Sequence, residues 1–450
     1  MKKVLIANRG EIARRIIRTC KYMGIQTIAV YSEADAELPF VKEADFAFLI
    51  GKGPVQQSYL KGEELIELAV REGADAIHPG YGLLSENGDF AKKVEEANLV
   101  FIGPNADTIR LMGDKIASRK TMITADVPVV PGTDDGIDTL GDAVEAAKKI
   151  GYPVMLKASA GGGGVGMIRC ETEQALVQQF ESVKNRAKAY FGSDLVFIEK
   201  FVVGARHVEV QIFGDHSGNI VHLFERNCSV QRRNQKVIEE SPSPALSDQA
   251  RNGLFEAAVK AAKAVKYTNA GTVEFIVDQD ETFYFLEMNT RLQVEHPVTE
   301  AVTNLDLVEW QIRIASGEEL PIKEQNEIPL KGHAIEYRIY AEDPEKFMPS
   351  PGKITLIHWD GQHARIDSGY EEGNQVTPFY DPMIAKVIIH GESREEAINK
   401  SKEFFKDASI EGVKTNVPFF REFVESEEFK NGDYATDVIG KWQQSKKGVL

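Results

Sequence analysis

Short apolar runs alternate with helical patterns over the first part of the chain. Ile12, Ile16, Cys20 and Met23 recur at spacings of four, four and three, which places them on one face of an amphipathic helix. Five apolar runs of strand length surround helical segments of this kind, at 4–7, 26–31, 46–50, 74–78 and 99–102. Strands that alternate with helices predict βαβ units and a parallel sheet.

Two further regions follow this predicted sheet. The second begins near Asp114 and contains four consecutive glycines. The third is richer in strand-like segments, which we expect at 334–340, 353–358 and 383–390 before a helix at 394–407. We expect a multidomain protein of the α/β and α+β classes, divided at about residues 1–113, 114–330 and 331–446.

Composition narrows the class of protein. The chain has 450 residues, with 69 acidic and 53 basic side chains, so its net charge is −16. This charge repels nucleic acid and favours small molecules or proteins as partners. No apolar run approaches the ~20 residues that span a bilayer, and the three scattered cysteines form no CxxC pair. We expect a cytoplasmic protein that binds neither membranes nor nucleic acid.

A glycine-rich segment follows an apolar run that ends in Lys157. Residues 161–166 include five glycines, whose backbone amides can approach phosphate oxygens without interference from a Cβ atom. The ammonium of Lys157 adds positive charge beside them. We interpret the segment as a loop that covers phosphate. A flexible hairpin turn is the alternative, although a turn rarely needs so many glycines, each with an entropic cost.

Two acidic residues are predicted to face each other in a hairpin. Strand-like runs at 271–278 and 282–289 flank a short turn, and a two-residue turn at 280–281 would place Glu274 opposite Glu287. Carboxylates in this position lie within about 5.5 Å at Cβ and repel each other. Mg²⁺ relieves such repulsion, because it binds one or two carboxylates together with substrate phosphates. A turn one residue longer would make the pair diagonal, which is still within reach of a shared ion. The hairpin therefore predicts a divalent metal site.

Polar residues continue to alternate with apolar ones after this hairpin. The polar positions are Glu287, Asn289, Arg291, Gln293 and Glu295, and if the backbone stays extended they share one face. Such a face could hold a metal, bind an oxyanion through Arg291 and offer Glu295 as a base. A solvent-facing strand edge shows the same alternation and is the alternative. The preceding apolar run predicts a buried strand, which makes an exposed continuation less natural.

Several motifs, taken in order, give the sequence a family resemblance. They are IANRGEIA at 6–13, HPGYG at 78–82, GGGG at 161–164, QRR at 231–233, EMNTR at 287–291 and VEHP at 294–297. Together they resemble the biotin carboxylase family of the ATP-grasp superfamily, over about residues 3–416. The resemblance implies a Rossmann-like N-terminal domain, a central ATP-grasp domain with a mobile lid at about 131–203, and a strand-rich C-terminal domain.

The implied activity is that of an ATP-grasp ligase, which carboxylates biotin on a carrier protein with ATP and bicarbonate. By this resemblance, ATP and two Mg²⁺ or Mn²⁺ ions bind in the central domain. The implied ATP contacts are Lys115, Lys157, Gly163, Gly164, Glu199, Lys200, Phe201, Val202, His207, Asn234, Glu274 and Glu287. The implied metal ligands are Glu274, Glu287 and Asn289, in agreement with the hairpin argument.

The resemblance also implies how carboxylation proceeds. The implied residues are Lys236, Arg291, Gln293 and the backbone N–H of Val294 for bicarbonate, Glu295 as the base, and Tyr81 and Arg338 for biotin. Attack of bicarbonate on the γ-phosphate would give carboxyphosphate, which would break down to CO₂ and phosphate. Phosphate would take the ureido proton of biotin, and Arg338 would stabilise the resulting enolate-like oxygen.

The chain departs from the family pattern at two positions. A basic residue usually stands where Val165 is found, and a histidine is common where Asn234 is found. Asparagine forms hydrogen bonds but carries no charge, so we expect weaker or altered contact with ATP there. Because no Met-Lys-Met motif precedes Leu450, we expect the biotin carrier and the carboxyltransferase on separate chains. The resemblance implies a homodimer within an acetyl-CoA or related acyl-CoA carboxylase of fatty acid biosynthesis.

Two other functions compete with this interpretation. A different ATP-grasp ligase would activate another carboxylate through an acyl phosphate, although Arg338 and the extended match at 287–297 argue against it. A nucleotide-binding regulatory or scaffold subunit without catalysis is suggested by Asn234. Every candidate charged catalytic residue is nevertheless present, which favours an active enzyme.

Overall fold

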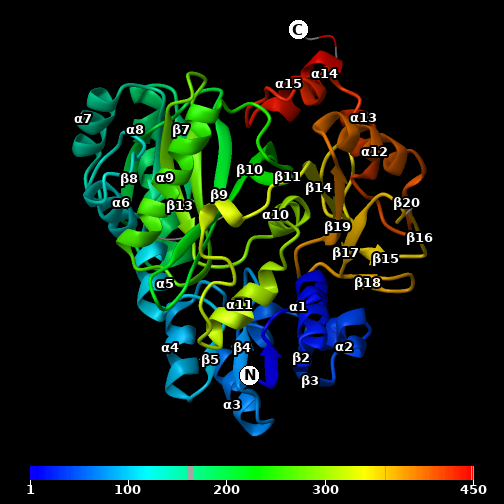
Figure 1. Ribbon diagram of the computed structural model, residues 1–450. Coiled ribbons are helices and arrows are strands. Elements are labelled where there is room, and N and C mark those ends of the chain that lie inside the picture. Colours follow the sequence, from blue (N-terminus) through cyan, green and yellow to red (C-terminus); the bar gives the residue numbers. More distant parts are fainter. Residues whose placement is uncertain (160–165, 360, 447, 449–450) are drawn as a thin grey trace.

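A parallel sheet forms the N-terminal part of the computed structural model, which describes residues 1–159, 166–359, 361–446 and 448 (Figure 1). Its strand order is β3-β2-β1-β4-β5. The strands are β1 (Lys3–Ile6), β2 (Gln26–Ser32), β3 (Phe46–Gly51), β4 (Ala76–His78) and β5 (Val100–Phe101). The helices are α1 (Gly10–Tyr22), α2 (Pro39–Glu43), α3 (Gly62–Arg71), α4 (Gly88–Glu96) and α5 (Ala106–Gly113). The predicted parallel sheet and its alternation with helices are confirmed.

An eight-stranded antiparallel sheet runs from the centre of the molecule into its C-terminal part (Figure 1). Its order is β13-β12-β9-β10-β11-β14-β19-β17. The strands are β9 (Arg206–Gly214), β10 (Ile220–Arg232), β11 (Gln235–Ser241), β12 (Asn269–Val277), β13 (Phe283–Asn289), β14 (His333–Tyr340), β17 (Arg365–Ser368) and β19 (Met383–Gly391). Because β11 pairs with β14, the second and third regions of the chain share one sheet.

A smaller three-stranded sheet, of order β7-β6-β8, lies at one side of the central region with its own core. Its elements are α7 (Leu140–Ile150), β6 (Val154–Ala158), β7 (Met167–Cys170), α8 (Glu173–Phe191) and β8 (Val196–Lys200). This part of the chain corresponds to the lid expected at about 131–203. The predicted phosphate-binding glycines Gly163 and Gly164, together with Val165, lie outside the described residues.

Helices cover both faces of the large sheet and complete the C-terminal part. Around the sheet lie α6 (Lys115–Thr124), α9 (Asp248–Ala264), α10 (His296–Thr303) and α11 (Leu307–Ala315). The C-terminal part adds the short strands β15 (Gly352–Lys353), β16 (Leu356–His358), β18 (Gln375–Val376) and β20 (Ser409–Glu411), and the helices α12 (Arg394–Asp407), α13 (Val417–Phe423), α14 (Glu427–Lys430) and α15 (Val438–Lys446). None of the helices in the described residues is long and apolar enough to span a membrane.

Helix α10 is held against the large sheet by a small apolar core. Val298 and Val302 of the helix are fully or almost fully buried against Ala334 of β14 and Ile388 of β19. Burial of aliphatic side chains of this size contributes about 1.5–3 kcal/mol each. The packing fixes the start of α10, and with it Glu295, above strands β11 and β14.

Candidate functional site

The facing pair of acidic residues predicted in the β12–β13 hairpin is confirmed. Glu274 pairs directly with Glu287. The predicted two-residue turn is wrong, because the loop is longer: Asp278 and Thr282 close it, and Glu281 adopts a φ of 65°. A register shift next to Glu274 compensates for the longer turn and restores the expected pair.

The extended backbone predicted for 287–295 is wrong beyond Asn289, where β13 ends. The chain then turns, and helix α10 begins directly after Glu295. The polar side chains nevertheless converge, since Arg291 donates to Oδ1 of Asn289 at 3.0 Å and to Oε1 of Gln293 at 2.7 Å. The residues are therefore brought together by a turn and a helix start, not by one face of a strand.

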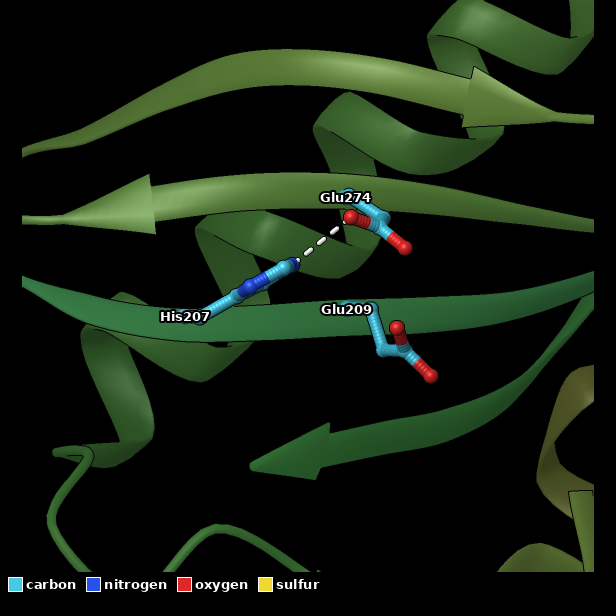
Figure 2. A group of neighbouring side chains, drawn as sticks. All are labelled: His207, Glu209 and Glu274. Atoms are coloured by element: carbon cyan, nitrogen blue, oxygen red, sulfur yellow. Dashed lines mark hydrogen bonds and ion pairs between the residues drawn. The ribbon is translucent and has the colours of Figure 1, made fainter. Parts of the chain in front are cut away.

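Glu274 is the centre of a buried hydrogen-bond network. Its Oε1 accepts from Lys236 at 2.9 Å, from the Asn289 amide at 2.9 Å and from the Gln293 amide at 3.1 Å. Its Oε2 lies 2.7 Å from Nε2 of His207 (Figure 2). Burial alone would raise the pKa of Glu274, but Lys236 and His207 lower it below its ordinary value. The carboxylate is therefore charged at neutral pH.

Glu295, the predicted base, is fully buried between two cations. Its Oε1 accepts a hydrogen bond from Lys236 at 2.7 Å, and its Oε2 accepts one from Arg338 at 2.9 Å. Burial opposes ionisation, but Lys236 and Arg338 hold the pKa of Glu295 well below its ordinary value. The carboxylate is anionic, which is the form that a general base requires.

Lys236 joins three carboxylates, one of which was not predicted from the sequence. Besides Glu274 and Glu295, its ammonium binds Oε2 of Glu209 at 2.5 Å. The other oxygen of Glu209 accepts from Arg226 at 2.6 Å, and both of these side chains are completely buried. The signal that could have identified Glu209 is the alternation of polar residues at 207, 209 and 211 along β9.

His207, Glu209 and Glu274 form one group that could hold a divalent ion. One ligand atom of each lies within 4.8 Å of the others, and Figure 2 shows them on the neighbouring strands β9 and β12. Both oxygens of Glu209 are already paired with Lys236 and Arg226. An ion at this position would have to displace a buried cation, which disfavours it as the primary metal site.

The predicted set of Glu274, Glu287 and Asn289 fits Mg²⁺ better. All three side chains supply oxygen, the ligand atom that a hard cation prefers. Among the described residues, no side chain donates a hydrogen bond to Glu287, and burial together with the charge of Glu274 raises the pKa of Glu287. Glu274 already contacts Lys236 and His207, so a divalent cation would supply the positive charge that Glu287 lacks among the described residues.

Basic residues approach the acidic hairpin from two other elements. Lys115 is the first residue of α6, and its ammonium lies within electrostatic reach of Glu287, Lys157 and Glu199. Burial lowers the pKa of Lys115 from its ordinary value. Lys157 of β6 forms an ion pair with Glu199 of β8. The predicted phosphate-binding lysines therefore lie on the same side of the site as the predicted metal ligands.

The next predicted nucleotide contacts follow β8. Lys200 donates to the carbonyl of Gly151 at 2.8 Å, and the N–H of Phe201 donates to the carbonyl of Pro153 at 3.0 Å. Val202 follows them and is partly buried. These contacts fix the segment to the start of β6. Its role in nucleotide binding stays a prediction.

Asn234 lies at an exposed hairpin tip. It follows Arg233 between β10 and β11, and the two residues have φ values of 51° and 66° in chain order. A two-residue turn of type I′ requires positive φ at both positions, and asparagine tolerates this conformation well. No described contact joins Asn234 to the buried network, so its role in ATP binding also stays a prediction.

Two residues that contact predicted site residues were not predicted from the sequence. Glu86 accepts a hydrogen bond from Nε of Arg291 at 2.9 Å and reaches it from the loop before α4. Burial opposes ionisation of this guanidinium, but Glu86 and Glu295 raise the pKa of Arg291. The Nη2 atom of Arg338 that contacts Glu295 also lies 2.6 Å from Oε1 of Glu239.

A third contact links the predicted biotin residue to the bicarbonate segment. The hydroxyl of Tyr81 donates to Glu11, which forms an ion pair with Lys386 at 3.0 Å. The ammonium of Lys386 also donates to the carbonyl of Val294 at 2.9 Å. Residues from the N-terminal, central and C-terminal parts therefore meet at one point, which no local sequence pattern indicates.

Family models match three segments of the chain. Residues 1–109 match the biotin carboxylase N-terminal domain, residues 114–323 match the ATP-binding domain of the carbamoyl-phosphate synthase L chain, and residues 336–441 match the biotin carboxylase C-terminal domain.

Relatives and solved structures resemble the chain over almost its full length. It is 56% identical over 438 residues to biotin carboxylase 2 of Bacillus subtilis, covering 97% of this chain and 98% of the relative. It is 53% identical over 443 residues to the mitochondrial methylcrotonoyl-CoA carboxylase subunit alpha of Mus musculus, covering 97% of this chain and 61% of that relative. The biotin carboxylase domain dimer of Hydrogenobacter thermophilus 2-oxoglutarate carboxylase, crystallised with MgADP, ADP and bicarbonate, is 46% identical with a TM-score of 0.96 and 98% coverage of each chain.

Proposed function

Because this chain belongs to the biotin carboxylase family of ATP-grasp ligases, we propose that it carboxylates biotin on a separate carrier protein with ATP and bicarbonate. The observation that supports this most strongly is the position of Glu295, held as a buried anion between Lys236 and Arg338. Arg291 lies within electrostatic reach of Glu295 and donates to Gln293, and these two side chains supply donors for a small oxyanion.

ATP binding is proposed where the acidic hairpin meets Lys115 and Lys157. The two ammonium groups would bind phosphate oxygens, together with the backbone of the glycine segment. Glu274, Glu287 and Asn289 would hold two Mg²⁺ or Mn²⁺ ions. When bound, these ions neutralise phosphate charge as the γ-phosphoryl group is transferred. The remaining proposed contacts to the nucleotide are Gly163, Gly164, Glu199, Lys200, Phe201, Val202, His207 and Asn234.

Bicarbonate is proposed to bind between Lys236, Arg291, Gln293 and the backbone N–H of Val294. Glu295 takes its proton, and the resulting oxygen attacks the γ-phosphorus while the bond to the β-phosphate oxygen breaks. The products are carboxyphosphate and ADP. The buried donors lie in a region of low dielectric constant, where they stabilise the developing negative charge most effectively.

Biotin is proposed to bind beside Tyr81 and Arg338. Carboxyphosphate breaks down to CO₂ and phosphate, and phosphate takes the N–H proton of the ureido ring. Arg338 stabilises the negative charge that develops on the ureido oxygen while the nitrogen attacks CO₂. Closure of the region at about 131–203 would keep water away from the reactive carboxyphosphate.

The wider assignment rests on the relatives. We propose a cytoplasmic homodimer with domains at 1–113, 114–330 and 331–446, and a related structure described as a dimer supports this state. The carrier and the carboxyltransferase are proposed as separate chains of an acetyl-CoA carboxylase of fatty acid biosynthesis or a related acyl-CoA carboxylase. Similar chains occur in methylcrotonoyl-CoA and 2-oxoglutarate carboxylases, so the partner carboxyltransferase selects the acceptor.

The direct test is ADP release from the purified protein with Mg²⁺ and ATP. Bicarbonate and free biotin are each added or left out. Release that requires bicarbonate and increases with biotin supports the proposal. Release that biotin does not stimulate would favour a different ATP-grasp ligase, and ATP binding without any release would favour a regulatory subunit.

A further inference from the structure

Two buried carboxyl groups beneath helix α10 have no part in the proposed reaction. Glu239 of β11 pairs directly with Glu336 of β14 in an antiparallel register, and neither residue is exposed to solvent. Side chains at directly opposed positions point to the same face of the sheet, with Cβ atoms about 4.5–5.5 Å apart. The two carboxyl groups therefore share one dry compartment.

The pair lacks hydrogen-bond donors. Neither oxygen of Glu336 accepts a hydrogen bond from any described residue. The only ion pair that Glu239 forms among those residues is the contact of its Oε1 with Arg338 at 2.6 Å. Burial raises the pKa of Glu239 to about 7 and raises the pKa of Glu336 well above its ordinary value. Two adjacent carboxyl groups in such a place do not both ionise at neutral pH.

The cations near the pair are already committed to other acids. The charged and titratable groups that face it are Arg338 and Tyr340 of β14, Lys386 of β19, Lys236 of β11, Cys228 of β10 and Glu295 at the start of α10. Lys386 binds Glu11 at 3.0 Å, and Lys236 binds three other carboxylates. Of these cations, only Arg338 forms an ion pair both with a member of the pair, Glu239, and with another carboxylate, Glu295.

We propose that Glu239 and Glu336 share a single proton, which Glu336 donates to Glu239, and that the half-protonated pair fixes the orientation of Arg338. The shared proton gives both carboxyl groups a hydrogen bond and leaves one negative charge, which faces Arg338. Glu336 is then a positioning residue that acts through Glu239. This inference rests on the proposed function, in which Arg338 meets the ureido oxygen of biotin.

The shared proton implies a defined pH dependence. When the pair loses its proton in alkaline solution, it carries two charges and draws Arg338 away from Glu295. The kcat/KM for biotin should therefore fall as pH rises through the pKa of the pair. In Glu336→Gln the amide still donates to Glu239 but has no titratable proton, so this fall should disappear or move upward by about one pH unit or more.

The experiment compares three variants over a pH series. Glu336→Leu cannot donate to Glu239, and we expect it to reduce kcat/KM for biotin about tenfold, whereas Glu336→Gln restores most of that loss. Glu240→Gln is the matched control, because Glu240 is a buried carboxylate of the same strand that binds His333 and Arg394 instead. Glu240→Gln should retain the decrease in kcat/KM for biotin at alkaline pH. A wild-type profile without this fall, or the same fall in Glu336→Gln, would overturn the proposal.

A second measurement separates this inference from the proposed function. Infrared difference spectra of wild type and Glu336→Gln, at a pH just above neutral and with hydrogen or deuterium in the solvent, need no turnover. The shared proton predicts a carboxylic acid band in the wild type that shifts on deuteration and is absent from the variant. If the band is found and biotin does not stimulate ADP release, only the functional assignment fails. If no band is found, the shared proton is wrong.

Discussion

Glu295 is the residue on which the proposed chemistry depends most directly. Its two oxygens bind different cations, Lys236 and Arg338, so it connects the proposed bicarbonate and biotin positions. Lys236 also binds Glu209 and Glu274. The negative and positive charges of these buried side chains therefore offset each other only when the whole group is present. Substitutions here are therefore best made with side chains of the same shape.

We expect Glu295→Gln to lower bicarbonate-dependent ADP release by about 100-fold or more, because an amide cannot accept the bicarbonate proton. ATP binding should remain within a fewfold of wild type, since Glu295 makes no proposed contact with the nucleotide. Steady-state kinetics and equilibrium binding of ATP measure the two effects. Bicarbonate-dependent turnover that persists at the wild-type rate would contradict the assignment of the base.

The arrangement of elements explains which parts of the site could be predicted. Strands and helices with a clear apolar period, such as 26–31 and 394–407, were predicted within about one residue of β2 and α12. The predicted pairing of Glu274 with Glu287 was correct although the predicted turn was wrong. The longer loop shifts the strand register by one residue, and the bulge next to Glu274 shifts it back. The polar alternation along β9 could have indicated Glu209, but no local pattern shows that Glu239 would join the site, since the pairing of β11 with β14 brings it there.

The turn between β10 and β11 requires positive φ at Arg233 and Asn234. Asn234 has a φ of 66°, so its replacement by alanine should lower the free energy of unfolding by about 1 kcal/mol. Asn234→Gly should cost little or nothing, because glycine adopts positive φ freely. Denaturant unfolding of both variants tests this. Equal stability of the two variants would mean that the turn conformation is not what favours asparagine.

For the molecule as a whole, a buried cluster ties the shared sheet to the C-terminal helices. Glu240 of β11 binds His333 of β14 and Arg394 of α12, and Tyr434 donates to it as well. Burial alone would raise the pKa of Glu240, but Arg394 and His333 lower it to about 2. A carboxyl group with a lowered pKa stabilises the folded state above the pKa of the unfolded chain and loses this effect as pH falls.

We therefore expect Glu240→Gln to lower the free energy of unfolding by about 3 kcal/mol at pH 7. The difference from wild type should shrink as pH falls from about 4.5 toward 2, where the wild-type carboxylate takes up its proton. Denaturant titrations between pH 3 and pH 7 measure the difference. A gap that is constant across this range would show that packing, and not charge, accounts for the loss.

The pairing of β11 with β14 has a consequence for any attempt to separate the second and third regions of the chain. A fragment that ends near residue 330 would lack β14, β19 and β17, and β11 would become a sheet edge with unpaired N–H and C=O groups. Such edges recruit other strands, so we expect this fragment to self-associate, as light scattering would measure, while the full chain does not aggregate. The boundary seen in the sequence near residue 330 therefore lies within one continuous sheet, and we expect the two regions to unfold together.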